Sequence, residues 1–309
     1  MPAYLESLTL RLAAGLESLS DDARERQAKF FKSFQLSDGG FRGREGGSDL
    51  YYTGFALRGL ALLGHLEDDV AKQATGYLRA QLSRQVPMVD FLSLIYGAAV
   101  LTLAAGSDVF AGSAAGWQQN IAVALERFRR DDGGYAKTDE GAASSLYHTF
   151  LVVLAQQLIE QPIVEATRII DFVRSRRRDD GGFVEMPQMK RSGTNPTAAA
   201  VGLLRILDAL DSDIRESTLD FLCEMQTDEG GLRANTRIPI ADLLSTFTGC
   251  LTLADLGALE DIDVSAVRRY AKQLEQPEGG FLGAVWDQTA DVEYTFYGLG
   301  TLALTANAE

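Results

Sequence analysis

Gly39-Gly40-Phe41, Gly133-Gly134-Tyr135, Gly181-Gly182-Phe183, Gly230-Gly231-Leu232 and Gly279-Gly280-Phe281 are five copies of one short element. Counted between first glycines, the copies are 94, 48, 49 and 49 residues apart, so the first gap is almost two periods long. A sixth, degenerate unit is therefore expected near residue 87, where Val86-Pro87-Met88 interrupts the chain. A fixed period of this length is typical of repeat proteins, in which each unit is one supersecondary motif.

Each unit contains two segments that are predicted to be helices. A long apolar segment follows the glycines, and an amphipathic segment leads to the next glycines. The apolar segments are Tyr52–Leu63, Tyr147–Leu158, Thr197–Leu210, Leu243–Leu256 and Thr295–Leu304. They are hydrophobic on nearly every face, as expected of a helix that is covered on both sides. In one amphipathic segment, Ile163, Ala166, Ile170 and Val173 form a stripe with helical spacing.

The alternation of two helix types predicts two concentric layers. Neither end of the chain has the strongly polar terminal repeat that an open solenoid needs. Closing six pairs into a ring would remove both ends. We therefore expect an all-α fold, a single domain over residues 1–309 built as an α6–α6 barrel (a toroid) of six helix-pair repeats of about 48 residues. The glycine turns are expected at one rim and the N-termini of the inner helices at the other.

Charge and composition argue against several classes of partner, and we expect a cytoplasmic protein. The 29 basic and 43 acidic residues give a net charge of −14, which argues against nucleic acid and anionic lipid as partners. Two cysteines without a CxxC motif fit a reducing compartment. The N-terminal segment is no signal peptide. The longest uncharged stretch, Phe91–Ser107, is shorter than the roughly 20 apolar residues of a membrane span, so no integral span is expected.

The residues that enter each apolar segment are the first candidates for function. A helix N-terminus attracts anions through its free N–H groups, and Asp or Ser there is a favourable N-cap. Capping is the expected role of Asp49, Asp90, Asp242 and Asp291. Capping does not explain His148 or Glu293, which follow two or three residues after the cap, although Glu293 could also be an acid of the capping turn.

The glycine element and the Asp-x-x-Tyr-Thr start of the next helix resemble the repeats of the prenyltransferase and squalene-cyclase superfamily. That start occurs as Asp49-Leu50-Tyr51-Tyr52-Thr53 and as Asp291-Val292-Glu293-Tyr294-Thr295. The chain most resembles the β subunits of protein prenyltransferases, particularly the Rab geranylgeranyltransferase type, over essentially its full length. The resemblance implies an α6–α6 barrel with a central lipid-binding cavity, and it does not specify one activity.

The same resemblance implies a zinc site that can be compared position by position. The β subunits carry Asp-x-Cys at the head of the fifth inner helix and a His at the head of the sixth. Here Asp242 is kept, Leu244 stands at the Cys position and Tyr294 at the His position. A catalytic zinc site needs about three protein ligands. No zinc and no other cofactor is therefore expected, although a bound diphosphate could bring Mg²⁺.

The family binds isoprenoid diphosphate through the loops of the fourth and fifth units, which here carry Lys190, Arg191, Arg233 and Arg237. Four cations could hold a diphosphate through charge-assisted hydrogen bonds. The alternative is a solvated loop that pairs with nearby acids. The candidates for lining the cavity are Tyr51, Tyr52, Tyr147, His148, Phe247, Trp286, Tyr294 and Tyr297. Each of them could equally belong to the core.

Three functions stay open at this stage. The favoured one is a prenyltransferase-like enzyme that binds a polyprenyl diphosphate and transfers or ionises it without zinc, with Asp242, Asp291, Glu293 and Tyr294 as catalytic candidates. The second is a class II terpene cyclase. Its Asp-x-Asp-Asp-Thr motif resembles residues 291–295, where Glu293 keeps an acid at the protonating position. The third is a non-catalytic isoprenoid-binding or interaction module. A protein partner is unknown.

Overall fold

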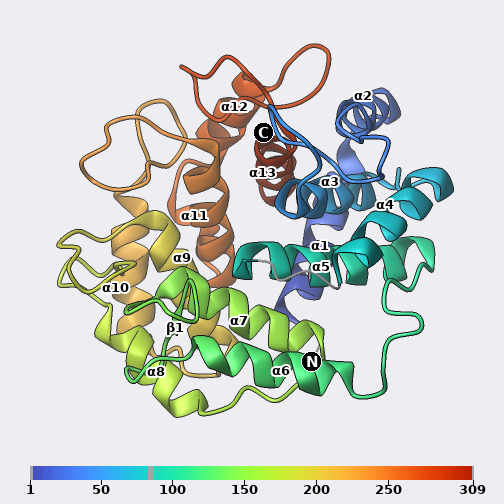
Figure 1. The fold of residues 1–309 in the computed structure, drawn as a ribbon. Coiled ribbons are helices and arrows are strands. Elements are labelled where there is room, and N and C mark those ends of the chain that lie inside the picture. Colours follow the sequence, from blue (N-terminus) through green and yellow to red (C-terminus); the bar gives the residue numbers. More distant parts are fainter. Residues whose placement is uncertain (1–2, 83–86, 308–309) are drawn as a thin grey trace. The chain divides into compact units, whose positions relative to one another are not determined.

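The computed structural model describes residues 3–82 and 87–307, and it confirms the all-α prediction (Figure 1). The α-helices are α1 (Tyr4–Gly15), α2 (Asp21–Lys32), α3 (Leu50–Leu63), α4 (Asp68–Gln81), α5 (Met88–Ala105), α6 (Trp117–Leu125), α7 (Leu146–Leu158), α8 (Ala166–Ser175), α9 (Thr194–Ile206), α10 (Ser212–Cys223), α11 (Leu243–Asp255), α12 (Val264–Leu274) and α13 (Val292–Leu304). Short 3-10 helices span Leu16–Ser18, Glu126–Phe128 and Leu259–Asp261. The two-residue strands β1 (Tyr135–Ala136) and β2 (Ser144–Ser145) pair antiparallel.

After α1, the helices follow the predicted order of pairs: α2/α3, α4/α5, α6/α7, α8/α9, α10/α11 and α12/α13. The second helix of each pair is the apolar one. The largest difference from the prediction is in α9, which begins at Thr194 and ends at Ile206 because the chain reverses at Asp208, where φ is +52°. The degenerate second unit is the pair α4/α5. Val86, part of its predicted break, lies outside the described residues.

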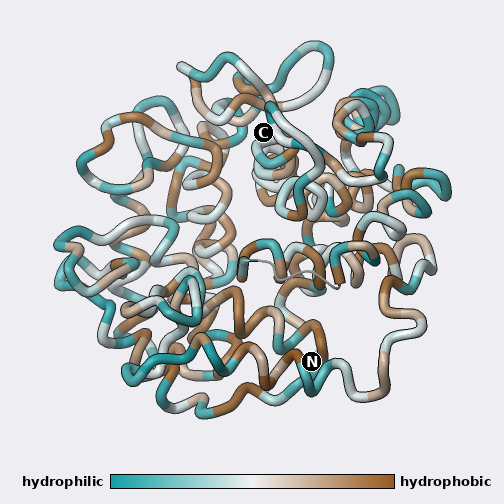
Figure 2. Tube along the Cα trace, in the orientation of Figure 1, coloured by the Kyte–Doolittle hydropathy of each residue, from teal (hydrophilic) through white to brown (hydrophobic). Residues whose placement is uncertain are grey.

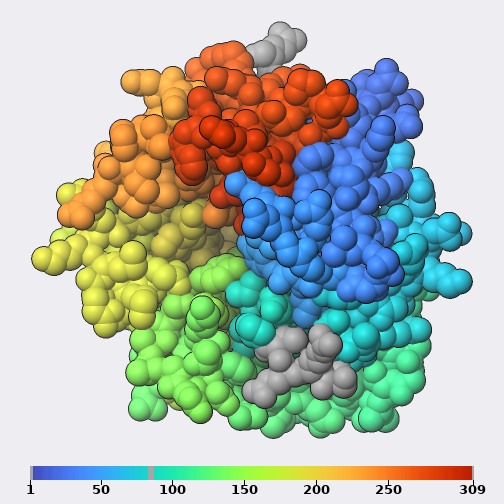
Figure 3. Space-filling model, turned by 45° about the horizontal axis from the view of Figure 1, so that its top comes forward, coloured from blue at the N-terminus to red at the C-terminus, as the bar shows by residue number. Residues whose placement is uncertain are grey.

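The chain divides into two compact units, which we describe separately. Unit 1 comprises residues 1–117 and 274–306, and unit 2 comprises residues 118–273 with 307–309. In unit 1, α3 packs against α2, α5 and α13, and α1 packs against α3 and α13. Figure 3 shows the blue N-terminal and red C-terminal segments of this unit side by side. In unit 2, α9 contacts α7, α8 and α11, and α10 contacts α11.

One buried hydrogen bond recurs in each of the five units that carry the glycine element. The N–H of the residue after the two glycines donates to a threonine hydroxyl in the first turn of the apolar helix, at 2.9 to 3.1 Å. The pairs are Phe41 with Thr53, Tyr135 with Thr149, Phe183 with Thr197, Leu232 with Thr246 and Phe281 with Thr295. The bond places each glycine turn beside the N-terminus of its own inner helix. The predicted placement of turns and N-termini at opposite rims is therefore wrong, because the loop folds back on itself.

The first glycine of each element is required by its conformation and by a close contact. At Gly230 φ is +98°, and an added Cβ would lie 2.5 Å from the carbonyl oxygen of Ala266 in α12. At Gly279, in the sixth unit, φ is +99° and the added Cβ would lie 2.8 Å from the carbonyl oxygen of Arg26 in α2. The glycine turn of the last unit thus packs on α2, the first outer helix. Each earlier glycine turn packs in the same way on the outer helix that follows it in the chain. This contact joins the first and last repeats inside unit 1.

Four helix heads have the side-chain caps expected from the sequence. The side chains of Asp49, Ser145, Asp242 and Asp291 accept hydrogen bonds from first-turn N–H groups of α3, α7, α11 and α13. The capping prediction for Asp90 is wrong, because α5 begins two residues earlier and Asp90 lies in its first turn.

Hydrophobic residues follow the helices, while many connecting loops are hydrophilic (Figure 2). Among the described residues, only α5 is long and apolar enough to cross a membrane. Half of that helix is buried in the protein, and the core helix of a soluble protein meets the same criteria. The helix is therefore weak support for a membrane span.

Candidate functional site

An open cleft of about 530 Å³ in unit 2 brings the loops of the fourth and fifth repeats together. Its lining residues are Gln188, Met189, Lys190, Arg191, Ser192, Gly193, Asn195, Pro196, Ala234, Asn235 and Arg237. Three of the four cations predicted for a diphosphate are in this set, and none of the lining residues is acidic. We call this site the cationic cleft. Arg191 joins its two walls, because Nη1 donates to the Thr236 hydroxyl at 3.1 Å.

The fourth predicted cation, Arg233, does not line the cleft. Its Nη2 donates to the carbonyl oxygen of Glu224, just after the end of α10, at 2.9 Å. The last carbonyls of a helix have no partner within the helix, and a cation there is favourable. The contact with α10 therefore accounts for the orientation of Arg233.

The N-terminus of α9 opens into the cationic cleft without a side-chain cap. Its N-cap is Gly193, in contrast to the Asp and Ser caps of α3, α7, α11 and α13. The fifth loop holds this helix end in place, since the Thr194 N–H and hydroxyl donate to the carbonyl oxygens of Ala234 and Arg233 at 2.9 and 2.6 Å. A helix N-terminus carries a partial positive charge. Here the Thr194 N–H is already bonded to Ala234 and Pro196 has no N–H, so the three cationic side chains contribute most of the positive charge of the cleft in a protein of net charge −14.

In unit 1, the heads of α3 and α13 form a second cluster around Glu293. The Tyr51 hydroxyl donates to Glu293 Oε1 at 2.6 Å. Burial raises the pKa of Glu293 above its usual value, and the charge of Asp291 adds to this. Hydrogen bonds from the Tyr51 and Tyr297 hydroxyls and the charge of Arg58 oppose it. A carboxyl that keeps its proton to higher pH can act as a general acid.

Asp291, a predicted catalytic residue, is held in an ion pair that the sequence did not predict. Arg44 Nε donates to Asp291 Oδ2 at 2.7 Å, while Nη1 and Nη2 donate to Asp287 at 3.0 and 2.6 Å. Asp291 also caps α13 by accepting from the Tyr294 N–H, and it is 3% exposed. Its cap and ion pair account for this carboxylate without a catalytic role. The same guanidinium lies over the Tyr294 ring at 5.7 Å, so Arg44 positions both residues.

Asp242 lies at the head of α11 in unit 2 and also serves as a cap. Its two carboxylate oxygens accept from the Ser245 N–H at 2.7 Å and the Ser245 hydroxyl at 2.8 Å. Burial raises its pKa. The neighbouring Leu244 has no ligand atom, and Tyr294 offers a phenol in place of an imidazole, so these positions do not fit the family's zinc site. In the part of the chain that the structure describes, no group of three His, Cys, Asp or Glu residues could hold a metal ion.

The predicted lining residues fall into four environments. Tyr51, Tyr52, Tyr294 and Tyr297 gather with Phe55 and Phe296 around the heads of α3 and α13. In unit 2, His148 Nδ1 lies 2.7 Å from the Ser145 hydroxyl, and burial lowers the His148 pKa; the Tyr147 N–H donates to Glu185. Phe247 is 4% exposed and belongs to the core, whereas Trp286 is 69% exposed on a loop.

Sequence reasoning missed Arg58 on α3. Its guanidinium carbon lies 4.1 Å from the Phe55 ring centroid, 4.6 Å from that of Phe296 and 5.0 Å from that of Tyr96. Rings from α3, α5 and α13 therefore surround one cation. The available signal was that Arg58 is the only charged residue within Leu50–Leu63.

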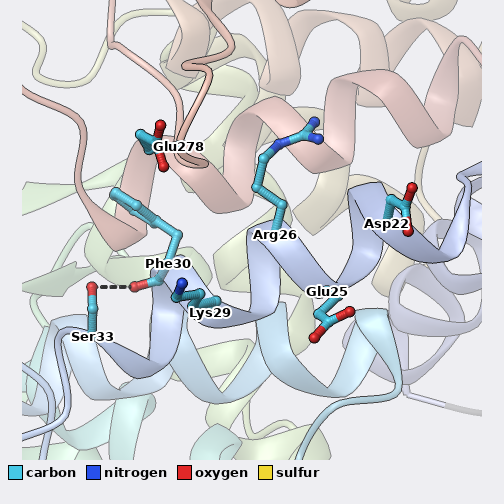
Figure 4. Close-up of a pocket in the computed structure, with 7 residues that line it drawn as sticks. All are labelled: Asp22, Glu25, Arg26, Lys29, Phe30, Ser33 and Glu278. Atoms are coloured by element: carbon cyan, nitrogen blue, oxygen red, sulfur yellow. Dashed lines mark hydrogen bonds between the residues drawn. The ribbon is translucent and has the colours of Figure 1, made fainter.

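A further groove of about 530 Å³ in unit 1 lies along α2 beside the glycine turn of the sixth unit (Figure 4). The side chains that line it are Asp22, Glu25, Arg26, Lys29, Phe30, Ser33 and Glu278. Three acidic and two basic side chains line it, and Arg26 is already paired with Glu275 at 2.7 Å. This groove therefore has no preference for an anion.

Helix pairs that repeat at one period, with glycine turns and buried threonines at each inner-helix head, define an α–α toroid. The chain belongs to the family of the prenyltransferase alpha-alpha toroid domain, which its residues 4–237 and 199–309 match. A curated relative is the β subunit of protein farnesyltransferase from Schizosaccharomyces pombe, 26% identical over 142 residues. That match covers 45% of this chain and 36% of the relative, so it spans about a third of the relative's length.

Solved structures share the fold at low sequence identity. Protein geranylgeranyltransferase-I from Candida albicans, complexed with GGPP, has a TM-score of 0.74 at 16% identity, covering 91% of this chain and 90% of its own. A type II terpene cyclase from Scytonema, in complex with geranylgeranyl dihydroxybenzoate, has a TM-score of 0.64 at 13% identity and covers 98% and 99%. An α-1,6-mannanase from Salegentibacter scores 0.65 at 12% identity, covering 93% and 99%. Since a mannanase shares the fold, function has to be argued from the site.

Proposed function

We propose that this protein binds an isoprenoid diphosphate, with the diphosphate in the cationic cleft. The observation that carries the proposal is the convergence of Lys190, Arg191 and Arg237 on the uncapped N-terminus of α9. A diphosphate carries several negative charges, and a cluster of cations with a helix N-terminus is suited to hold it. The GGPP complex of the Candida albicans neighbour supports this class of ligand.

The same groups could assist a transfer reaction. When the bond between C1 of the isoprenoid and the diphosphate oxygen breaks, the electron pair stays on the leaving diphosphate. Cations already positioned there stabilise that developing charge. An acceptor nucleophile would then form the new bond to C1, and bound Mg²⁺ could share the charge. The acceptor, a protein partner and a cytoplasmic location remain predictions.

The test is calorimetric binding of farnesyl and geranylgeranyl diphosphate, with and without Mg²⁺, compared with the parent alcohols. We expect Lys190→Ala and Arg191→Ala each to weaken diphosphate binding by about 10- to 100-fold, since a hydrogen bond to a charged group contributes roughly 1.5–3 kcal/mol. Affinity for the alcohols should not change. Arg233→Ala is the matched control, because this cation shares the fifth loop but bonds to Glu224. Equal losses in Arg233→Ala and Arg191→Ala would reject the cationic cleft as the diphosphate site.

A second candidate is a cyclase in which Glu293 protonates an alkene, and one observation favours it. Burial and the Asp291 charge keep the Glu293 carboxyl protonated to higher pH, and the residue lies among aromatic rings at the heads of α3 and α13. Incubation with polyprenyl substrates and mass spectrometry of the products would test it. Glu293→Gln should abolish a cyclic product and leave binding intact. Unchanged turnover in that variant would exclude the acid role, and binding without any product would favour a non-catalytic carrier.

A further inference from the structure

Arg58 is a charged residue in an apolar helix, and none of the functions above uses it. The side chain is half-buried, so part of it remains accessible. Its Nε donates to the carbonyl oxygen of Gly54 in the same helix at 3.0 Å. Among residues 3–82 and 87–307, the terminal nitrogens Nη1 and Nη2 form no hydrogen bond and no ion pair within 4.0 Å, and the charge of Arg58 acts on the Glu293 carboxyl only over a longer distance. Arg205, the corresponding lone cation of α9, has Asp255 as its partner at 3.2 Å.

The surroundings of Arg58 increase the strength of any ionic contact it makes. The rings of Phe55, Tyr96 and Phe296 lie 4.1 to 5.0 Å from the guanidinium carbon and shield part of it from water. Electrostatic attraction is stronger in such a low-dielectric environment than in water. A guanidinium that keeps two terminal nitrogens available can donate two parallel hydrogen bonds to one carboxylate.

From these contacts we infer that Arg58 and its three rings bind the carboxylate of an apolar, isoprenoid-type ligand. The inference relies on the proposed function only for the apolar part of the ligand. One guanidinium matches the single charge of a carboxylate, and the flanking rings match an apolar chain. A diphosphate would need the several cations that the cationic cleft provides. A carbocation is disfavoured here, because the fixed positive charge of Arg58 would repel it.

The experiment compares farnesoic acid with farnesol, which share the chain and differ in the head group. Binding is measured by calorimetry at pH 7.5 for the full-length wild type and for Arg58→Met and Arg58→Lys. We expect the wild type to bind the acid about 10- to 100-fold more tightly than the alcohol. In Arg58→Met this ratio should fall close to one while farnesol affinity is kept. Arg58→Lys should restore only part of the ratio, because an ammonium lacks the planar pair of donors.

Arg42→Met is the control for loss of an arginine–aromatic contact, since Arg42 lies over the Phe34 ring at 5.1 Å in the same unit. It should keep the wild-type ratio. An unchanged ratio in Arg58→Met would overturn the inference. So would a parallel loss of acid and alcohol binding, which would assign Arg58 to packing. Farnesyl diphosphate distinguishes the two proposals. Its affinity should fall in Lys190→Ala and should not change in Arg58→Met. The reverse response would reject both the carboxylate assignment and the cationic cleft.

Discussion

The repeated threonine hydrogen bond gives a sharp prediction at Thr246. The side chain is 0% exposed, its hydroxyl accepts from the Leu232 N–H at 2.9 Å, and it donates to the Asp242 carbonyl oxygen at 2.6 Å. Thr246→Val keeps the shape and removes the hydroxyl. The variant loses a bond contributing about 1 kcal/mol and leaves a buried N–H unpaired, which costs about 1–3 kcal/mol more. We expect a loss of about 2–4 kcal/mol in the free energy of unfolding.

The assay is urea unfolding followed by circular dichroism, with amide hydrogen exchange at Leu232 as the local probe. Thr246→Ser keeps the hydroxyl and removes one methyl group, so it should lose only about 1 kcal/mol. The Leu232 amide should exchange faster in Thr246→Val than in Thr246→Ser. If the serine variant is as unstable as the valine variant, packing of the methyl group accounts for the threonine, and the hydrogen-bond reasoning is refuted.

The remaining predictions concern pH and the glycine turns. Burial places the pKa of the Glu293 carboxyl above its usual 4.5, so the folded wild type binds this proton more tightly than the unfolded chain does. The free energy of unfolding of the wild type should therefore fall as the pH rises above 4.5. Glu293→Gln lacks this titrating group, so its free energy of unfolding relative to wild type should increase with pH in urea titrations from pH 4 to 8. If the free energies of unfolding of the two proteins depend on pH in the same way, the raised pKa of Glu293 is contradicted. Gly230→Ala should cost more than about 2 kcal/mol, because its Cβ would lie 2.5 Å from a carbonyl oxygen. Gly46→Ala has a similar positive φ of +89° but nothing within 4 Å, so thermal denaturation should show a loss of only about 1 kcal/mol.

The repeats predicted the helix pairs well because one local rule acts five times. The two glycines, the aromatic or leucine residue after them and the later threonine recur together, and each copy forms the same turn, hydrogen bond and helix head. The capping role predicted for Asp90 was wrong because the second unit lacks the glycine element. Without it, the start of α5 could not be located by comparison with the other units.

The sequence grouped the candidate cations that lie in neighbouring loops, and it missed the contacts between distant segments. Lys190, Arg191 and Arg237 lie in two consecutive loops, and a family resemblance was sufficient to group them. Arg233 differs because the end of α10 holds its side chain. The contacts of Arg44 with Asp287 and Asp291 join residues more than 240 positions apart, and no local pattern of spacing encodes them.

The division of the chain has a consequence for its biosynthesis. Unit 2 is nearly continuous in sequence, while unit 1 needs residues 1–117 and residues 274–306. The Tyr51–Glu293 bond spans 242 positions, so the N-terminal part of unit 1 must wait on the ribosome until α13 has emerged. During that interval the apolar face of α3 that later packs against α13 is without its cover, which is a condition that favours aggregation. We therefore expect unit 1 to be the part of the chain that needs chaperones during translation. Substitutions in α13 should lower the yield of folded protein more than comparable substitutions in unit 2.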